Sequence, residues 1–204
     1  QQVGAGGGVI QVLSNAVLDG ITNGPILNLG TVLVNDQTRL DLAGTINNVG
    51  SILLDQQSIG GATDLRLVAQ NVVLQGGGQV LMSNNSLNRI YATDSTIQLV
   101  NVNNTIAGAG QLGANLALTL INQATGLINA NQATALAVGT NGRLATNLGL
   151  MESTNTGGLL IYNTPINNAG GTILATGAGS HVDLATATIE GGVLSTALGG
   201  VINV

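Results

Sequence analysis

The residues of this sequence that could do chemistry are charged, and most of them lie in its first half. The candidates for a surface site are Asp36, Arg39, Asp41, Asp64, Arg66 and Arg89. Together with Asp55 and Asp94 they make up 8 of the chain's 13 charged residues. A polysaccharide-cleaving enzyme can bind Ca²⁺ through carboxylates and use an arginine as its base, and paired carboxylates can hydrolyse a glycosidic bond. Polysaccharide chemistry is therefore the activity that these side chains suggest.

A second interpretation of the same residues is structural. Arg39, Arg66 and Arg89 recur at similar intervals along the sequence, and each is followed by Leu or Ile. If the chain coils with a similar period, the three arginines form a ladder on one face, next to Asp41, Asp64 or Asp94. Sugar-cleaving grooves usually stack their substrate on aromatic rings, and this chain has two Tyr and no Trp or Phe. We therefore favour neutralising ion pairs on a solvated face.

Two further patterns resemble functional motifs but lack their context. Residues 108–113 read GAGQLG, the spacing of a dinucleotide-binding loop, which needs a following helix and an acidic residue about 20 positions on. The next acidic residue is Glu152, so we expect a glycine-rich corner. Ser180, His181 and Asp183 stand together, but alternation places His181 and Asp183 on the outer side of a strand, where a nucleophilic triad has no sheltered pocket.

The charge balance excludes several classes of partner. The chain has 204 residues, a net charge of −5, no Lys and four Arg against nine acidic residues. Nucleic-acid binding needs many basic side chains to neutralise phosphates, so no nucleic-acid partner is expected. No run of about 18 apolar residues occurs, which predicts no membrane insertion. No residue pattern calls for a cofactor or a metal.

The elements that position these residues follow from a degenerate internal repeat. An aliphatic strand, a bend rich in Asn or Gly and a second aliphatic pair recur at 46–52, 121–128, 144–151, 166–173 and 189–194. The starting positions of the last four repeats are almost evenly spaced. Within strands such as 31–35 and 64–68 alternate residues are apolar, as expected for one face inward and one outward. Asn and Gly suit the bends because they tolerate left-handed backbone conformations.

This repeat predicts an all-β fold, a right-handed parallel β-helix (β-solenoid) of about nine rungs of about 22 residues. Residues 1–204 form one domain, with an insertion expected in one rung between about 70 and 120, where the spacing is less regular. Residues 200–204 stop within a strand pattern. This predicts either a segment of a longer rod or ends that stack on other copies.

The second half of the chain resembles a known family of proteins. The segments NNTIAGAGQLG (103–113), GLMESTN (149–155), INNAGGTI (166–173) and ATIEGGVL (187–194) look like tandem segments of filamentous-haemagglutinin-like adhesins and autotransporter passengers of bacteria. The resemblance covers roughly half of the chain. It implies a β-helical rod at the cell surface or outside the cell, with no catalytic residues to carry over.

Three functions remain open at this stage. The first is a non-catalytic structural or adhesive rod, whose partner is a host or surface glycan or protein. The second is a filament subunit that associates with itself through the solenoid ends. The third is a β-helical polysaccharide-active enzyme, which only the charged residues support.

Overall fold

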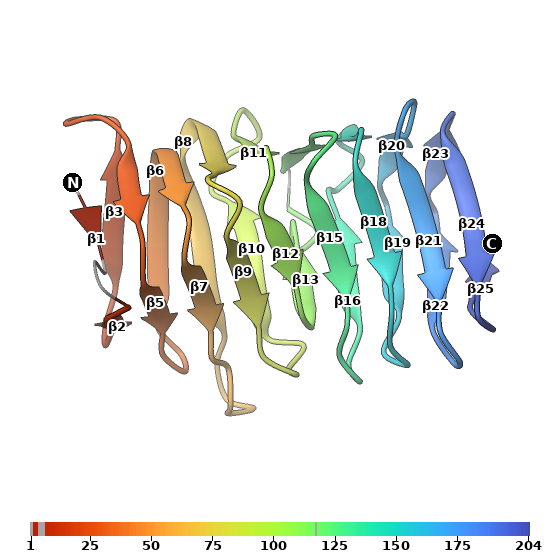
Figure 1. Ribbon diagram of the computed structural model, residues 1–204, viewed down its shortest axis with the longest axis horizontal. Coiled ribbons are helices and arrows are strands. Elements are labelled where there is room, and N and C mark those ends of the chain that lie inside the picture. Colours follow the sequence, from red (N-terminus) through yellow and green to blue (C-terminus); the bar gives the residue numbers. More distant parts are fainter. Residues whose placement is uncertain (1, 4–6, 117) are drawn as a thin grey trace.

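The computed structural model describes residues 2–3, 7–116 and 118–204, which form 25 β-strands and no helix. No helix in these ranges is therefore long and apolar enough to cross a membrane. Every recorded strand pair is parallel, including β2 with β5 and β22 with β25. In Figure 1 the front strands run downward and the rear strands upward while the chain advances from left to right, so the solenoid is right-handed. The predicted fold class is confirmed.

Each turn of the solenoid has three faces, which we number in the order that the chain visits them. Face I is a nine-stranded sheet. Faces II and III are the two arms of a 16-stranded sheet, and the long strands β6 (Arg39–Asn48) and β8 (Thr63–Gln75) cross from one arm to the other. Each rung therefore has three strand segments, one on each face.

Each face has nine strands when β6 and β8 are counted on both face II and face III. Face I contains β2 (Val9–Val12), β5 (Thr31–Val34), β7 (Ser51–Leu54), β9 (Gln79–Met82), β12 (Thr105–Ala107), β15 (Leu127–Ala130), β18 (Leu150–Ser153), β21 (Thr172–Thr176) and β24 (Val193–Ala197). Face II adds β3 (Ala16–Gly20), β10 (Asn88–Ala92), β13 (Gly110–Leu112), β16 (Leu136–Gly139), β19 (Leu159–Tyr162), β22 (His181–Ala185) and β25 (Val201–Asn203). Face III adds β1 (Gln2–Val3), β4 (Ile26–Asn28), β11 (Gln98–Asn101), β14 (Thr119–Asn122), β17 (Ala145–Asn147), β20 (Pro165–Asn167) and β23 (Thr188–Glu190).

The length of a turn differs slightly from the prediction. The first and last strands of face I start at Val9 and Val193 with eight turns between them. The average is about 23 residues a turn, against the predicted value of about 22 residues. The longest turn runs from Ser51 to Gln79, and its extra length lies in the loop 55–62. An insertion was expected between 70 and 120, and the turn from Gln79 to Thr105 is longer than average, but the larger insertion lies before this range.

The interior is filled by columns of aliphatic side chains, one from each rung. Val32, Ile52, Val80, Ile106 and Ile128 follow one another in register on face I, and each is at most 1% exposed. Such a side chain contributes about 1.5–3 kcal/mol when fully buried. Because alternate residues of a strand point outward, the same strands present a second set of side chains to solvent.

Asparagine has two different roles at the corners. Asn115, Asn141 and Asn163, between faces II and III, have φ of 51°, 53° and 45°, which confirms the expected left-handed bends. At the corner between faces III and I, a set of buried asparagines has no positive φ and bonds through its side chains instead: Asn28, Asn48, Asn101, Asn104, Asn122, Asn147 and Asn168. Their amides form a ladder along the solenoid, in which five of the seven, Asn28, Asn48, Asn101, Asn122 and Asn147, donate from Nδ2 to the Oδ1 of an asparagine on a later rung.

Candidate functional site

Five of the six predicted site residues lie close together on the outer side of face II. We call them, with Tyr91, the charged cluster: Arg39 and Asp41 on β6, Asp64 and Arg66 on β8, and Arg89 and Tyr91 on β10. They occupy two columns of three consecutive rungs. One column reads Arg39, Asp64, Arg89, and the other reads Asp41, Arg66, Tyr91.

Asp41 binds two of the arginines. The Nε and Nη2 atoms of Arg66 donate to its two oxygens at 2.9 and 2.6 Å, a paired arrangement across neighbouring strands. Arg39, two residues before it on the same strand, donates from Nε to Oδ1 at 3.0 Å. The hydrogen bonds from its guanidinium to Asp41 raise the pKa of Arg66, and this effect outweighs the opposing effect of burial. Arg66 therefore stays positively charged throughout the physiological pH range.

Asp64 binds the third arginine in the same way. Arg89 donates from Nε and Nη2 to its two oxygens at 2.7 and 2.8 Å, which raises the pKa of Arg89. The Arg89 guanidinium carbon lies 5.1 Å from the centre of the Tyr91 ring, within the range of a cation–π contact. Burial raises the pKa of Tyr91, so its hydroxyl stays neutral, and this hydroxyl lies 3.4 Å from Asp64 Oδ2.

The two predictions for these residues have different outcomes. The arginines share a face, and each is paired with a carboxylate, as expected. They do not form one ladder, because Asp64 separates Arg39 from Arg89 and Arg66 lies in the adjacent column. The sequence interpretation gave no role to Tyr91, although its position two residues after Arg89 places both on the same side of a strand.

Asp36 lies apart from the cluster, at the corner between faces I and II. Its Oδ1 accepts hydrogen bonds from the backbone N–H groups of Gln57 and Ser58 at 3.0 and 3.1 Å, and its Oδ2 accepts one from the Ser58 hydroxyl. Hydrogen bonds from Ser58 and Gln57 lower the pKa of Asp36. Asp36 thus holds the loop 55–62 against the preceding rung.

The residues around His181 also lie as the sequence predicted. His181 Nε2 lies 3.3 Å from Asp183 Oδ2 on the outer side of β22, and Asn203 donates to Asp183 Oδ1 at 2.6 Å. Ser180 is buried, and its hydroxyl donates to the carbonyl of Gly177 at 2.9 Å. The serine therefore points away from the histidine, and the three residues form no nucleophilic triad.

The GAGQLG segment is a corner of the solenoid. Gly108, Gly110 and Gly113 have φ of 128°, 136° and 93°, a region that favours glycine. The short strand β13 follows Gly108, where a dinucleotide-binding loop would need a helix. The prediction of a glycine-rich corner is confirmed.

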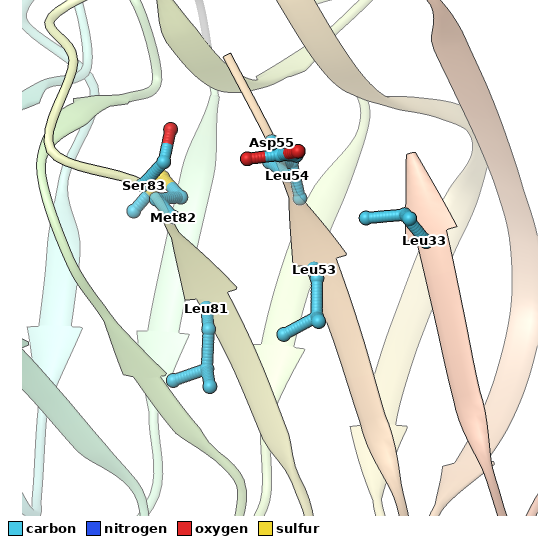
Figure 2. Close-up of a pocket in the computed structure, with 7 residues that line it drawn as sticks. All are labelled: Leu33, Leu53, Leu54, Asp55, Leu81, Met82 and Ser83. Atoms are coloured by element: carbon cyan, nitrogen blue, oxygen red, sulfur yellow. The ribbon is translucent and has the colours of Figure 1, made fainter. Parts of the chain in front are cut away.

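Face I has an apolar groove that the sequence interpretation missed. Leu33, Leu53 and Leu81 are register partners on β5, β7 and β9 and project outward. Figure 2 shows them beside Asp55 and Ser83 at the ends of the strands, around a shallow hollow of about 320 Å³. The signal was the Val-Leu-Val, Leu-Leu and Leu-Met runs, in which the outward positions are apolar as well as the inward ones.

Comparisons with known proteins identify no relative. No family model, no curated protein and no solved structure matches the chain. Among the described residues, no three His, Cys, Asp or Glu side chains lie together as a metal site would require. The geometry of the described faces therefore carries the functional argument.

Proposed function

We propose that this chain is a stiff, non-catalytic rod of a bacterial surface or secreted protein, which holds whatever it is joined to at a fixed distance. The supporting observation is an unbroken register on face I. Eight successive strand pairings connect Gln11 on β2 to Ser195 on β24. The extracellular location is part of the proposal and rests on the resemblance of the second half to bacterial adhesin rods.

The physical basis of stiffness is that each rung is bonded to both neighbours at every face. Backbone hydrogen bonds join the strands, aliphatic columns fill the interior, and the buried asparagine ladder ties one corner. Bending such a rod would have to stretch hydrogen bonds on one face. The ion pairs of the charged cluster add one more set of cross-rung contacts.

A distance measurement tests the rod directly. The chain has no Cys, so Gln11→Cys with Ser195→Cys creates one pair of sites for spin labels. Eight strand spacings of about 4.8 Å place the two backbones about 38 Å apart. Gln11→Cys with Asn129→Cys is the matched control, five pairings apart, at about 24 Å. Narrow distance distributions in this ratio are expected, and a broad distribution for the longer pair would contradict a stiff spacer.

End-to-end assembly is a second candidate function. The aliphatic columns of face I include Ile10 on β2 and Leu194 on β24, which are 41% and 48% exposed. A second copy could continue both the aliphatic columns and the backbone pairing, in a head-to-tail contact that repeats. Light scattering on the labelled samples tests this, because the mass should rise with concentration, and a constant monomer mass would contradict it.

A further inference from the structure

We propose that the charged cluster of face II binds a linear acidic polysaccharide through its three arginines. The first observation is how the charges are layered. The side chains of Asp41 and Asp64 are 8% and 11% exposed, whereas those of Arg39, Arg66 and Arg89 are 29%, 26% and 36% exposed. The carboxylates therefore lie beneath the guanidinium groups, and an approaching ligand meets the positive groups first.

The cluster also carries an excess of positive charge. Three guanidinium groups face two carboxylates, a net charge of +1 within a chain whose total is −5. The carboxylates bind the Nε and Nη2 groups of Arg66 and Arg89 and the Nε of Arg39. The Nη1 groups of all three arginines, and the Nη2 of Arg39, take no part in these bonds. These donors suit the planar carboxylate of a ligand.

The spacing of the arginines favours a polymer over a single small anion. Arg39, Arg66 and Arg89 come from three consecutive rungs, so they advance along the solenoid by about 4.8 Å a rung, with Arg66 offset by two residues into the adjacent column. A chain of uronic acid units lying along face II carries a carboxylate on every unit and can present successive anionic groups to successive arginines. Tyr91 and Gln111, the neighbour of Arg89 on β13, add a ring and an amide beside this path.

An acidic peptide fits this surface less well. Peptides commonly bind a sheet by pairing with an open strand edge. On face II, β8 pairs with β6 on one side and with β10 on the other, and β10 also pairs with β13. The backbone around the cluster is therefore already occupied, which leaves side-chain recognition of anionic groups on the ligand.

The experiment is a calorimetric titration of the whole chain with an oligomer of galacturonic acid. The fully methyl-esterified oligomer, which keeps the sugar and loses the charge, is the ligand control. Binding to the acid form alone is expected, with an affinity that falls as salt is added. Equal binding of the ester, or no binding of the acid, would overturn the proposal. Equal binding of a poly-glutamate of the same charge would contradict the choice of a polysaccharide.

Substitutions locate the site. Arg39→Gln should weaken binding about tenfold, since it removes one charge-assisted contact and breaks the fewest internal bonds of the three arginines. Arg39→Lys keeps the positive charge but loses the planar guanidinium group. Its affinity should lie between those of the parent chain and of Arg39→Gln. Arg143→Gln is the matched control, because Arg143 is exposed in the loop between β16 and β17. An equal loss in the Arg143 variant would show non-specific attraction and contradict the assignment.

The binding test is independent of the distance measurement that tests the stiff rod. A variant can lose the oligouronate and keep the distance between its spin labels, or the reverse. The thermal unfolding midpoint of each arginine variant checks that the fold is intact. If the parent chain cleaved the oligomer and Arg66→Gln did not, the binding site would be supported. The same result would contradict the non-catalytic part of the proposed function.

Discussion

Glu152 shows how a single side chain on the solenoid surface acquires unusual properties. It projects from the outer side of face I between Asn129 and Leu174, its register partners on β15 and β21. Asn129 donates to Glu152 Oε1 at 2.8 Å. Burial against these neighbours raises the pKa of Glu152. The folded chain therefore binds this proton more tightly than the unfolded chain does.

The sign of the resulting pH dependence follows from linkage. Because the folded-state pKa is raised, the stability of the fold falls as pH rises from the unfolded value through the folded value, and stays lower above it. Glu152→Gln removes the charge and keeps the acceptor for Asn129. The variant should have a higher free energy of unfolding than the parent at pH 7, and the gain should disappear below about pH 4.

Urea unfolding at pH 7 and at about pH 3.5 measures the effect. Glu190→Gln is the control, because Glu190 is exposed on β23 and should change the stability little at either pH. If Glu152→Gln were equally stabilising at both pH values, titration of this carboxyl would not be the cause.

Some residue roles can be read from the sequence and others cannot. The composition alone marked the first-half arginines and aspartates as the chemically distinct residues, and strand alternation put them on the outside. The pairing of Arg66 with Asp41 and of Arg89 with Asp64 depends on the register between rungs. The register between rungs depends on how many residues each turn of the solenoid contains. On face I this number is smallest from β5 to β7 and largest from β7 to β9. A repeat length averaged over the chain therefore cannot predict which arginine pairs with which aspartate.

Among the elements, the corner between faces III and I is the one most tightly specified. Asn122 Nδ2 donates to Asn147 Oδ1 at 2.9 Å and to the carbonyls of Gly126 and Leu150 at 3.1 and 3.2 Å. Its Oδ1 accepts from Asn101 Nδ2 at 2.9 Å. The sequence showed bends rich in Asn or Gly but not this ladder, because bend-forming and ladder-forming asparagines are the same residue type.

Breaking the ladder should be costly. Asn122→Ala removes four hydrogen bonds and leaves buried acceptors on the adjacent rungs without a donor, which should lower the free energy of unfolding by about 2–4 kcal/mol. Asn71→Ala is the control, since Asn71 is exposed on β8 and should cost less than about 0.5 kcal/mol. Chemical denaturation measures the free energy of unfolding of both variants. Equal decreases would show that the ladder stabilises the fold no more than an exposed asparagine does.

For the whole molecule, the stacked architecture means that each rung contacts chiefly its two neighbours. Stability is then close to a sum of rung terms and interfaces between rungs, with no single centre. The repeat in the sequence predicted stacked rungs, but it did not show that each rung has three faces. The long strands β6 and β8 bend between two faces, and their register shifts between Leu42 and Gly44, where Gly44 has a φ of 69°. One glycine within a strand marks this corner, which is a weaker signal in the sequence than a glycine-rich loop.

A core substitution in the middle of the rod should therefore act locally. Ile106 on β12 is fully buried between Val80 and Ile128, so Ile106→Ala should cost about 2–5 kcal/mol. Hydrogen exchange should accelerate in β9, β12 and β15, while β24 and β25, four rungs away, keep the exchange rates of the parent chain. Ile202→Ala on the outermost rung is the control and should cost less, because Ile202 is already partly exposed. Acceleration spread evenly over all rungs by Ile106→Ala would instead show that the rod opens as one cooperative unit, and rung-by-rung stability would be wrong.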